Sequence, residues 1–292
     1  MNPDPPPGIG SSRRPRTQNV LSDLDIRPLD GDSEYRACVS LQDLTWGPGF
    51  AEAVPPTLLR LVQQLGGIAS GAFDPGGRLL GFVFGITGWV GGQPVHWSDM
   101  LAVHPDARDR GIGERLKRHQ RDVLLRTGVR LARWTFDPLE ARNARLNLSI
   151  LGATTGTYVR DFYGESVSAL HHGIGTDRLI IDWQLDSLRV DRRLRGLDPA
   201  PDSASLNDVP VVNAPHIESD MSTCGETDLA KTDSRLAIYV PAGIQELKQA
   251  DPHLALRWRA VTRVAFESYL GRGYRAVEFV RRGGFGYYLL ER

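Results

Sequence analysis

"MLAVHPDARDRGIGERLKRHQRD", residues 100–122, decides the fold of this chain. An apolar strand ends at Val103, and Pro105 stops it because proline has no backbone N–H to donate. Gly111 and Gly113 then begin a basic segment whose apolar residues recur at helical spacing. The stretch predicts a strand, a glycine-containing turn and a helix whose exposed face carries Arg115, Lys117, Arg118 and Arg121.

The predicted turn has the properties of an anion-binding site. Gly111 and Gly113 leave the backbone open to close approach by a ligand. The first amides of a helix have no intrahelical acceptor, and the helix dipole adds partial positive charge there. Arg108 and Arg110 add two full charges beside these amides. Together these features favour a site for phosphate.

Two common phosphate-binding motifs are excluded by the residues themselves. The nucleoside-triphosphate loop GxxxxGK[ST] does not occur in the sequence. The dinucleotide motif GxGxxG fails because Leu116 stands where its third glycine is required. The pattern that remains is Arg-x-x-Gly-x-Gly, residues 108–113, between a strand and a helix.

The sequence on both sides of this motif predicts a mixed α/β layer. Asp137 as a cap and Pro138 at the first helical position predict a helix that ends near Gly152. The order of strands and helices is not a simple alternating repeat. The expected strands cover residues 24–30, 67–103 (three strands), 129–137, 157–164 and 177–186, and the expected helices cover 32–44, 55–65, 111–126 and 137–152.

Composition divides the chain into four parts. Residues 1–22, rich in Pro, Gly, Ser and Arg, are expected to be a disordered tail, and residues 23–186 form the main domain. The polar stretch 187–234 has little periodicity and is expected to be a linker or irregular arm. Residues 235–292 predict a small α+β unit with a helix from Asp251-Pro252 to Gly271. No internal repeat stands out.

The bulk composition excludes several classes of protein. The 292 residues are 24% charged and 41% hydrophobic, as in ordinary soluble globular proteins. The formal net charge of zero argues against a nucleic-acid partner, and no apolar run is long enough for a membrane span or a secretory signal. Cys38 and Cys224 lie outside any CxxC pair, which argues against a disulfide framework or metal knuckle. The expected compartment is the cytoplasm.

The segment LAVHPDARDRGIGERL, residues 101–116, resembles the acyl-CoA-binding motif of the GNAT superfamily of N-acetyltransferases. The resemblance covers about residues 24–186 in element order as well as in motif. It implies an α/β fold with a mixed, mostly antiparallel central sheet flanked by helices. More loosely, the whole chain resembles a bacterial subgroup with a C-terminal extension, of which some members are thought to transfer succinyl groups to amino acids.

The resemblance implies acetyl-CoA or another acyl-CoA as cosubstrate, and no metal. In the family, the loop amides hold the pyrophosphate of coenzyme A, and the preceding strand holds the acyl carbonyl and the pantetheine arm. Asn143 and Asn147 on the later helix either hydrogen-bond that arm or lie at its exposed face. The loop and strand residues expected to bind the cosubstrate are Leu101, Ala102, Val103, Arg108, Asp109, Arg110, Gly111, Ile112 and Gly113.

Acyl transfer to an amine needs a base that takes a proton from the amine and a donor for the tetrahedral oxyanion. The expected oxyanion donor is a backbone N–H of the strand near residues 101–103. Asp99 is the candidate base, because strand alternation places it on the face of Leu101 and Val103, and the family often carries Glu or Asp there. A structural pairing with an arginine is the alternative role for Asp99. His96 is a rival base of opposite parity beside Trp97.

The general acid is the point at which this sequence departs from the family. The family's helix pattern Asn-x-x-Ala-x-x-x-Tyr-x-x-x-Gly, aligned on Gly152, places Leu148 at the tyrosine position. Tyr158 and Tyr163 in the next strand are candidates to replace it, and Tyr163 is the one we select. Both could instead be packing aromatics, and a thiol is acidic enough to leave without a dedicated acid.

The sequence thus predicts a cytoplasmic, acyl-CoA-dependent N-acyltransferase that moves an acetyl or succinyl group to an amine. The expected acceptor is a small molecule such as an amino acid, and no nucleic acid or membrane partner is expected. A carboxylate on the acceptor would need a cation, for which Arg142, Arg145 and Arg160 are candidates. The alternative is a catalytically inactive acyl-CoA-binding module. The resemblance also allows a homodimer through the later strands.

Overall fold

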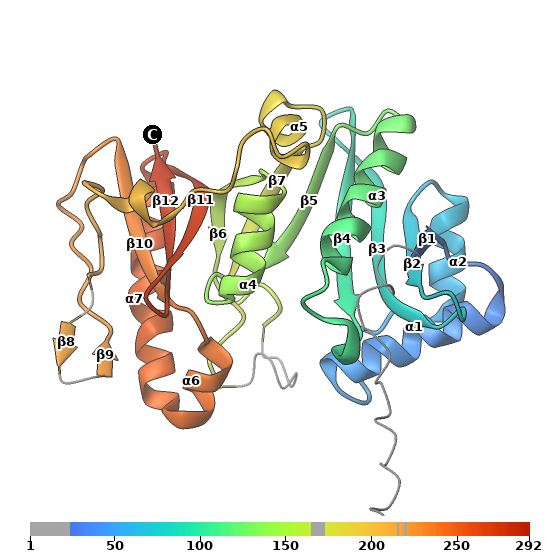
Figure 1. Ribbon diagram of the computed structural model, residues 1–292, viewed down its shortest axis with the longest axis horizontal. Helices are drawn as coiled ribbons and strands as arrows, with labels where there is room; N and C mark the ends of the chain where they lie inside the picture. The colour runs from blue at the N-terminus through green and yellow to red at the C-terminus, as the bar shows by residue number, and fades with distance from the viewer. Residues whose placement is uncertain (1–23, 165–172, 215, 219–220) are drawn as a thin grey trace, which may run out of the picture.

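The computed structural model describes residues 24–164, 173–214, 216–218 and 221–292, and the expected tail at 1–22 lies outside them. Within the described residues, one ten-stranded sheet runs through the molecule in the order β1-β2-β3-β4-β5-β7-β6-β11-β12-β10 (Figure 1). A separate two-stranded sheet is formed by β8 and β9. None of the described helices is both long enough and apolar enough to cross a membrane.

The described residues up to Val159 contain six strands and the helices between them. The strands are β1 (Asp25–Pro28), β2 (Ile68–Phe73), β3 (Leu79–Val90), β4 (Gln93–Val103), β5 (Leu131–Phe136) and β6 (Thr154–Val159). The helices are α1 (Gly31–Trp46), α2 (Pro56–Gln64), the 3₁₀ turn Pro105–Ala107, α3 (Ile112–Arg126), α4 (Ala141–Ala144) and the π-helical segment Arg145–Ile150.

The described residues after Val159 contain six further strands and three α-helices. The strands are β7 (Arg178–Gln184), β8 (His216–Glu218), β9 (Met221–Thr223), β10 (Arg235–Pro241), β11 (Arg275–Arg282) and β12 (Phe285–Glu291). The helices are α5 (Leu188–Leu194), the 3₁₀ turn Ser203–Leu206, α6 (Ile244–Ala250) and α7 (Pro252–Gly271). The stretch 187–234 thus carries a helix and a hairpin within an otherwise irregular arm.

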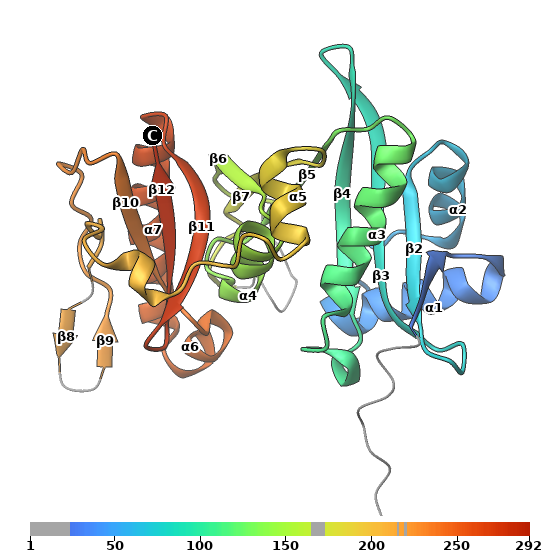
Figure 2. The same cartoon turned by 45° about the horizontal axis from the view of Figure 1, so that its top comes forward.

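The sheet is mixed and mostly antiparallel, as expected, because β4 and β5 are its one parallel pair in the described residues. Helices cover both faces of its first half (Figure 2). One buried cluster packs α1 and α2 against β2, β3 and β4. A second, larger cluster contains Ile112 and Leu116 of α3 together with Trp134 of β5. The amphipathic pattern that predicted these helices therefore corresponds to two apolar layers, one on each face of the sheet.

The strands β4 and β5 separate after a short paired segment. Val95–Trp97 pairs with Leu131–Arg133, and β4 then continues to Val103 without a partner on its β5 side. At the same place β4 bulges, because two of its residues, Ser98 and Asp99, lie opposite Gly85 of β3. The bulge and the separation place Asp99 at the point where the two parallel strands part.

The C-terminal residues extend the sheet and repeat the topology of its centre. In both places a strand is followed by helix and two strands, and the last strand lies between the other two: β5-β7-β6 and β10-β12-β11. The two parts meet where Ala276 of β11 pairs with Thr155 of β6. Trp258 and Phe266 of α7 belong to the same buried cluster as Trp134. The expected strand and helix elements of residues 235–292 are present, but they share the main sheet and its core.

Two local expectations were wrong. The helix expected to begin at Asp137 and Pro138 begins at Ala141, because the Asp137 carboxylate accepts a hydrogen bond from the Leu139 N–H at 2.8 Å and forms a turn before the helix. The strand expected over residues 157–164 ends at Val159. Tyr163 therefore lies outside the sheet, in the connection that follows β6.

Candidate active site

The turn before α3 has the backbone geometry that the anion-site prediction requires. Gly111 has φ of 73° and Asp109 has φ of 61°, so both residues occupy the left-handed region, which glycine enters without steric cost. Helix α3 begins at Ile112, directly after Gly111, so its first amides face the turn. Beside them, Arg108 Nε donates to Val103 O at 3.3 Å, and Arg110 is exposed.

The packing of the protein does not require a glycine at position 113. A Cβ at this position would meet Leu101 at 3.7 Å and Val103 at 3.9 Å, which are ordinary van der Waals distances. The absence of a side chain is therefore not required by packing, and it keeps the backbone accessible in front of β4. A cradle of free amides with this open approach fits the pyrophosphate of coenzyme A.

The helix α4 lies across the turn from α3. Arg142 forms an ion pair with Asp109, with its Nη2 3.2 Å from Asp109 Oδ1. Asn143 is exposed on the same helix. Asn147 is buried with 3% of its surface exposed, and its Oδ1 accepts the Trp134 Nε1–H at 3.2 Å. The pantetheine contact expected of Asn143 stays a prediction, whereas the Asn147 side chain is buried and bound to Trp134.

The residues of β4 after the bulge have one free backbone side. Ala102 is buried among the residues that face α1, and Leu101 and Val103 pack against the cluster that contains α3. Their backbone groups on the β3 side are used in the sheet. Those that face β5 have no strand partner within the described residues. Val103 O accepts the Arg108 Nε–H, and the N–H groups are available to a ligand that enters between β4 and β5.

Asp99 lies on the β4 side of this opening. Burial by the surrounding protein raises the pKa of Asp99, and the neighbouring Trp97 side chain, acting as a hydrogen-bond donor, opposes the rise. The residue nevertheless remains open to solvent. A carboxylate with a raised pKa at an accessible position has the properties of a general base.

Tyr163 lies on the β5 side of the opening. Its hydroxyl is 3.0 Å from Thr135 Oγ1 of β5. Its ring packs edge-on against Phe162 with centroids 4.8 Å apart, and Phe162 stacks on Trp97 at 6.2 Å. We call Trp97, Phe162 and Tyr163 the aromatic wall. It joins Asp99 to Thr135 by an unbroken series of contacts, so the two candidate catalytic residues border the same opening.

The other candidates from the sequence have structural environments. His96 is fully buried and lies 3.0 Å from both Thr87 Oγ1 and Gln120 Nε2 through its two ring nitrogens. Burial lowers the pKa of His96 to about 3, helped by the nearby charge of Lys117. Tyr158 donates its hydroxyl hydrogen to Asp177. Leu148, which stands at the family's tyrosine position, is fully buried and has no group that can donate a proton.

A buried lysine beside this opening was not predicted from the sequence. Lys117 was expected on the exposed face of α3, but it is 2% exposed. Its Nζ donates to Ser98 Oγ at 2.8 Å and to Gln120 Oε1 at 3.1 Å. Burial lowers the pKa of Lys117 to about 7. The only sequence signal is that Lys117 follows Leu116 directly, at the border of the apolar stripe.

Two of the three arginines proposed for carboxylate binding form ion pairs with carboxylates of the protein itself. Arg142 pairs with Asp109, and Arg160 forms a two-pronged ion pair with Glu267. Arg145 is exposed. Within the described residues, no cluster of His, Cys, Asp and Glu could hold a metal ion.

Comparison with known proteins identifies the class. Residues 39–146, which include β4, the turn and α3, match the acetyltransferase (GNAT) family. No curated protein matches the chain. The chain therefore carries a domain of the GNAT family of acetyltransferases. It is an acyl-CoA-dependent N-acyltransferase, and the predicted family resemblance is confirmed.

Many solved structures are similar at low identity. The ribosomal-protein-S18-alanine N-acetyltransferase of Escherichia coli is 19% identical, covers 56% of this chain and 95% of its own, and has a TM-score of 0.43. The acetyltransferase yncA of Salmonella typhimurium, solved with acetyl-CoA, is 19% identical, covers 62% and 99%, and has a TM-score of 0.45. An aminoglycoside 6'-N-acetyltransferase complexed with coenzyme A is 15% identical, covers 56% and 98%, and has a TM-score of 0.43.

Proposed function

We propose that this protein transfers an acetyl or succinyl group from its CoA thioester to the amine of a small molecule such as an amino acid. The observation that carries the proposal is the opening between β4 and β5, which Asp99 borders on one side and Tyr163 on the other. The same opening leads to the free backbone groups of β4 and to the amides at the start of α3. On this proposal, Asp99 serves the acceptor amine, the β4 backbone serves the thioester carbonyl, and the first amides of α3 serve the pyrophosphate.

The residues supply the proton transfers that the reaction needs. The acceptor nitrogen forms a bond to the thioester carbonyl carbon, and Asp99 takes the proton that the nitrogen loses. A backbone N–H of β4 near Leu101 stabilises the oxyanion of the tetrahedral intermediate. When the carbon–sulfur bond breaks, the sulfur leaves with the electron pair. Tyr163 donates a proton to it, or the sulfur leaves as a thiolate that solvent protonates.

The aromatic wall supports a small acceptor that has an apolar part. Phe162 and Tyr163 are 38% and 40% exposed, so their rings offer apolar surface beside Asp99. Aromatic faces at the mouth of a site bind apolar or planar groups and leave polar atoms for directed hydrogen bonds. The buried free cysteines Cys38 and Cys224 agree with the reducing cytoplasm that we propose as its location.

A second candidate function is an acyl-CoA-binding module without turnover. The specific observation in its favour is Leu148, which occupies the family's tyrosine position and is fully buried. This function requires the turn before α3 but neither Asp99 nor Tyr163.

Two linked measurements test both functions. Calorimetric titration of the purified protein with CoA, acetyl-CoA and succinyl-CoA is expected to show saturable binding, tighter for the thioester that is the true donor. With that donor, thiol release in the presence of each of the twenty amino acids is expected to reveal the acceptor. Binding without thiol release for any amine would favour the module, and no binding to any of the three compounds would overturn both functions.

A further inference from the structure

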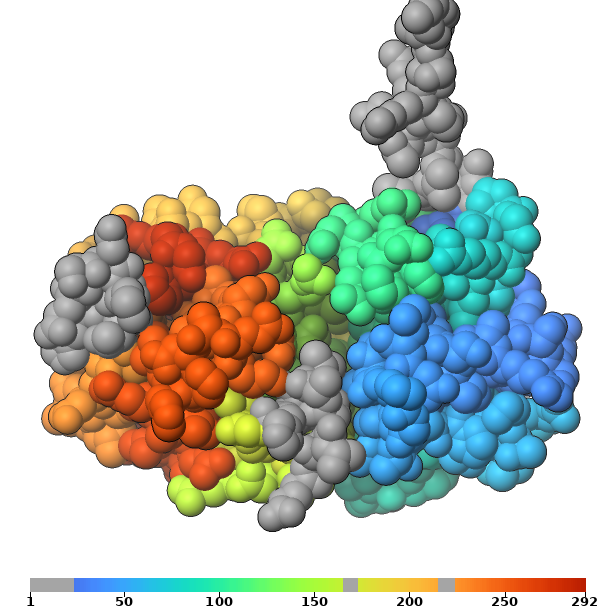
Figure 3. Space-filling model, turned by 90° about the horizontal axis from the view of Figure 1, so that it is seen from below, coloured from blue at the N-terminus to red at the C-terminus, as the bar shows by residue number. Residues whose placement is uncertain are grey.

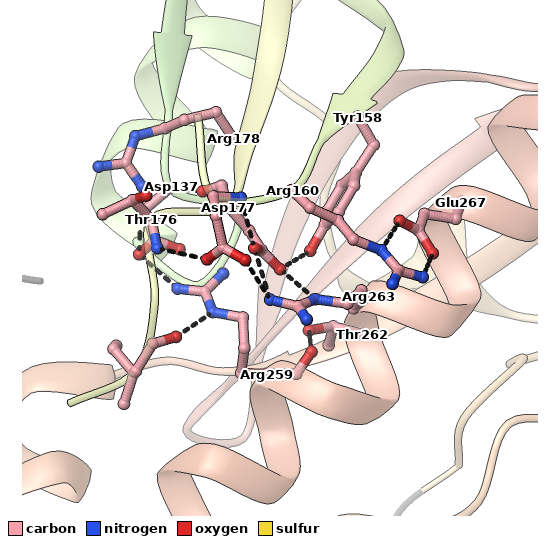
Figure 4. A network of polar contacts seen from close by, with 12 residues as sticks. Asp137, Tyr158, Arg160, Thr176, Asp177, Arg178, Arg259, Thr262, Arg263 and Glu267 are labelled. Atoms are coloured by element: carbon pink, nitrogen blue, oxygen red, sulfur yellow. Dashed lines mark hydrogen bonds and ion pairs between the residues drawn. The ribbon is translucent and has the colours of Figure 1, made fainter. Parts of the chain in front are cut away.

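Two arginines of α7, Arg259 and Arg263, reach from the C-terminal part of the chain to the connection between β6 and β7. They contact its two described ends, residues 161–164 and 174–177, which we call the β6–β7 ends (Figure 4). The first of these ends carries Phe162 and Tyr163 of the aromatic wall. Seen from below in Figure 3, the blue helix α1 and the orange helices α6 and α7 lie on opposite sides of the molecule.

Arg263 binds a carboxylate that organises both β6–β7 ends. Its Nε and Nη2 donate to the two oxygens of Asp177 at 2.7 Å each, and Asp177 is fully buried. The same carboxylate accepts the backbone N–H of Asp161 at 3.1 Å and the hydroxyl hydrogen of Tyr158. Planar, two-pronged pairing of this kind fixes orientation as well as distance.

Arg259 binds the second end and also β5. Its Nε donates to Ile174 O at 3.0 Å, and its Nη2 donates to Asp137 Oδ2 at 2.6 Å. Asp137 directly follows β5, the strand that carries Thr135. Arg259 is 3% exposed and Asp137 is 4% exposed, so water screens this pair weakly. The Arg259 guanidinium therefore links the second of the β6–β7 ends to Asp137, which directly follows β5.

Thr176 connects the residues that Arg259 and Arg263 bind to Phe162 and Tyr163 of the aromatic wall. Its carbonyl oxygen accepts the Phe162 N–H at 3.1 Å, and its hydroxyl oxygen accepts the Tyr163 N–H at 3.2 Å. Thr176 lies between Ile174 and Asp177, the two positions that α7 binds. The backbone of Phe162 and Tyr163 is thus fixed, through one residue, to both arginines.

Phe162 and Tyr163 need this support because they lie beyond the end of β6 and remain partly exposed. A loop without such anchors would populate several conformations, and fixing its backbone costs about 1–2 kcal/mol per residue. Buried charges are costly to desolvate, so their presence here needs a compensating role.

We propose that Arg259 and Arg263 of α7 are positioning residues, which hold Phe162 and Tyr163 at the opening between β4 and β5. The C-terminal part of the chain thereby completes the acceptor side of the site. This inference rests on the proposed function for its catalytic consequence, but not for its structural one.

Hydrogen exchange of the full-length protein, read by mass spectrometry, tests the structural part. In Arg263→Gln, the amides of Phe162 and Tyr163 are expected to exchange at least about tenfold faster than in the wild type. Arg275→Gln is the matched control. Arg275 also joins the two parts of the sheet, through an ion pair with Asp182 at 3.1 Å, but it does not contact the β6–β7 ends. Its exchange at Phe162 and Tyr163 is expected to be unchanged.

Steady-state kinetics test the catalytic part with the amine identified by thiol release. Arg263→Gln is expected to lower kcat/KM for the amine by about tenfold or more, with an unchanged Kd for acetyl-CoA. Arg263→Lys, which keeps the charge but not the two-pronged geometry, is expected to recover part of the loss. Arg263→Lys also serves as the folded variant for hydrogen exchange if Arg263→Gln does not fold.

The outcomes separate the two proposals. Unchanged exchange at Phe162 and Tyr163 in both Arg263 variants would overturn the positioning role, as would equal acceleration in Arg275→Gln. If the wild type transfers no acyl group to any amine, the proposed function fails, and hydrogen exchange still decides whether α7 positions the wall.

Discussion

The Nζ of Lys117 lies 3.8 Å from the ring centroid of Trp134, in the interior between α3 and β5. The ring face offsets part of the cost of burying the ammonium, together with the hydrogen bonds to Ser98 and Gln120. Burial lowers the pKa of Lys117 to about 7, from an ordinary value of 10.5. Between these two pH values the unfolded chain binds a proton that the folded protein does not, so the free energy of unfolding rises with pH.

Lys117→Met is therefore expected to stabilise the protein most at low pH. At pH 6, where the wild type must bury the charged ammonium, the variant is expected to be more stable by about 1–4 kcal/mol. The gain is expected to shrink as pH rises from 7 towards 10. Urea unfolding at pH 6 and pH 9.5 measures the difference. Lys231→Met is the control, because Lys231 is partly exposed and its ion pair with Asp228 is open to water, so the expected change is about 1 kcal/mol or less. A gain independent of pH for Lys117→Met would contradict the prediction.

Gly113→Ala is expected to separate folding from ligand binding. The added Cβ meets Leu101 and Val103 at ordinary distances, and alanine favours a helix over glycine by up to about 1 kcal/mol. Thermal unfolding is thus expected at an equal or higher temperature, whereas calorimetry is expected to show weaker binding of acetyl-CoA. Gly113→Leu is expected to abolish binding while the fold is retained. Native affinity in the leucine variant would exclude the turn as the pyrophosphate site.

Asp99→Asn is expected to lower kcat and to leave the Kd for acetyl-CoA unchanged. A carboxylate base works only when ionised, so the wild-type rate is expected to fall as pH drops through the raised pKa of Asp99. The asparagine variant is expected to lose that limb of the pH–rate profile. Profiles of kcat between pH 4 and pH 9 test this, and an acid limb that persists in the variant would remove Asp99 as the base.

Tyr163→Phe keeps the ring that packs on Phe162 and removes only the hydroxyl near Thr135. If Tyr163 donates a proton to the leaving sulfur, kcat is expected to fall by about 10²-fold or more, with an unchanged KM for the amine. Tyr274→Phe is the matched control, because that hydroxyl donates to the Asp233 carbonyl oxygen and takes no part in the aromatic wall. Equal rates in Tyr163→Phe and the wild type would show that the thiolate leaves without a protein acid.

Local patterns predicted the turn before α3 and two of the longest helices well, but not the short helices α5 and α6. The helix at the basic segment and the helix between Asp251-Pro252 and Gly271 have the expected bounds within one residue, because caps, glycines and apolar spacing are short-range signals. The mixed sheet also follows from the order of elements.

Long-range features were beyond the reach of the sequence pattern. The start of α4 was misplaced because Asp137 hydrogen-bonds Leu139 and Arg259, and the second partner lies far along the chain. Lys117 was expected outside because lysine is almost never buried without a specific environment, here Ser98, Gln120 and Trp134. The topological repeat left no recognisable trace in the residues. Tyr163 was the chosen acid, but its place beside Thr135 depends on a turn that α7 anchors.

The distance in sequence between Tyr163 and Arg263 has a consequence for synthesis. A ribosome makes the chain from the N-terminus, so the turn before α3, β4 and the candidate base exist well before α7 has been translated. On the proposed role of α7, synthesis therefore supplies the donor side of the site before the residues that position its acceptor side.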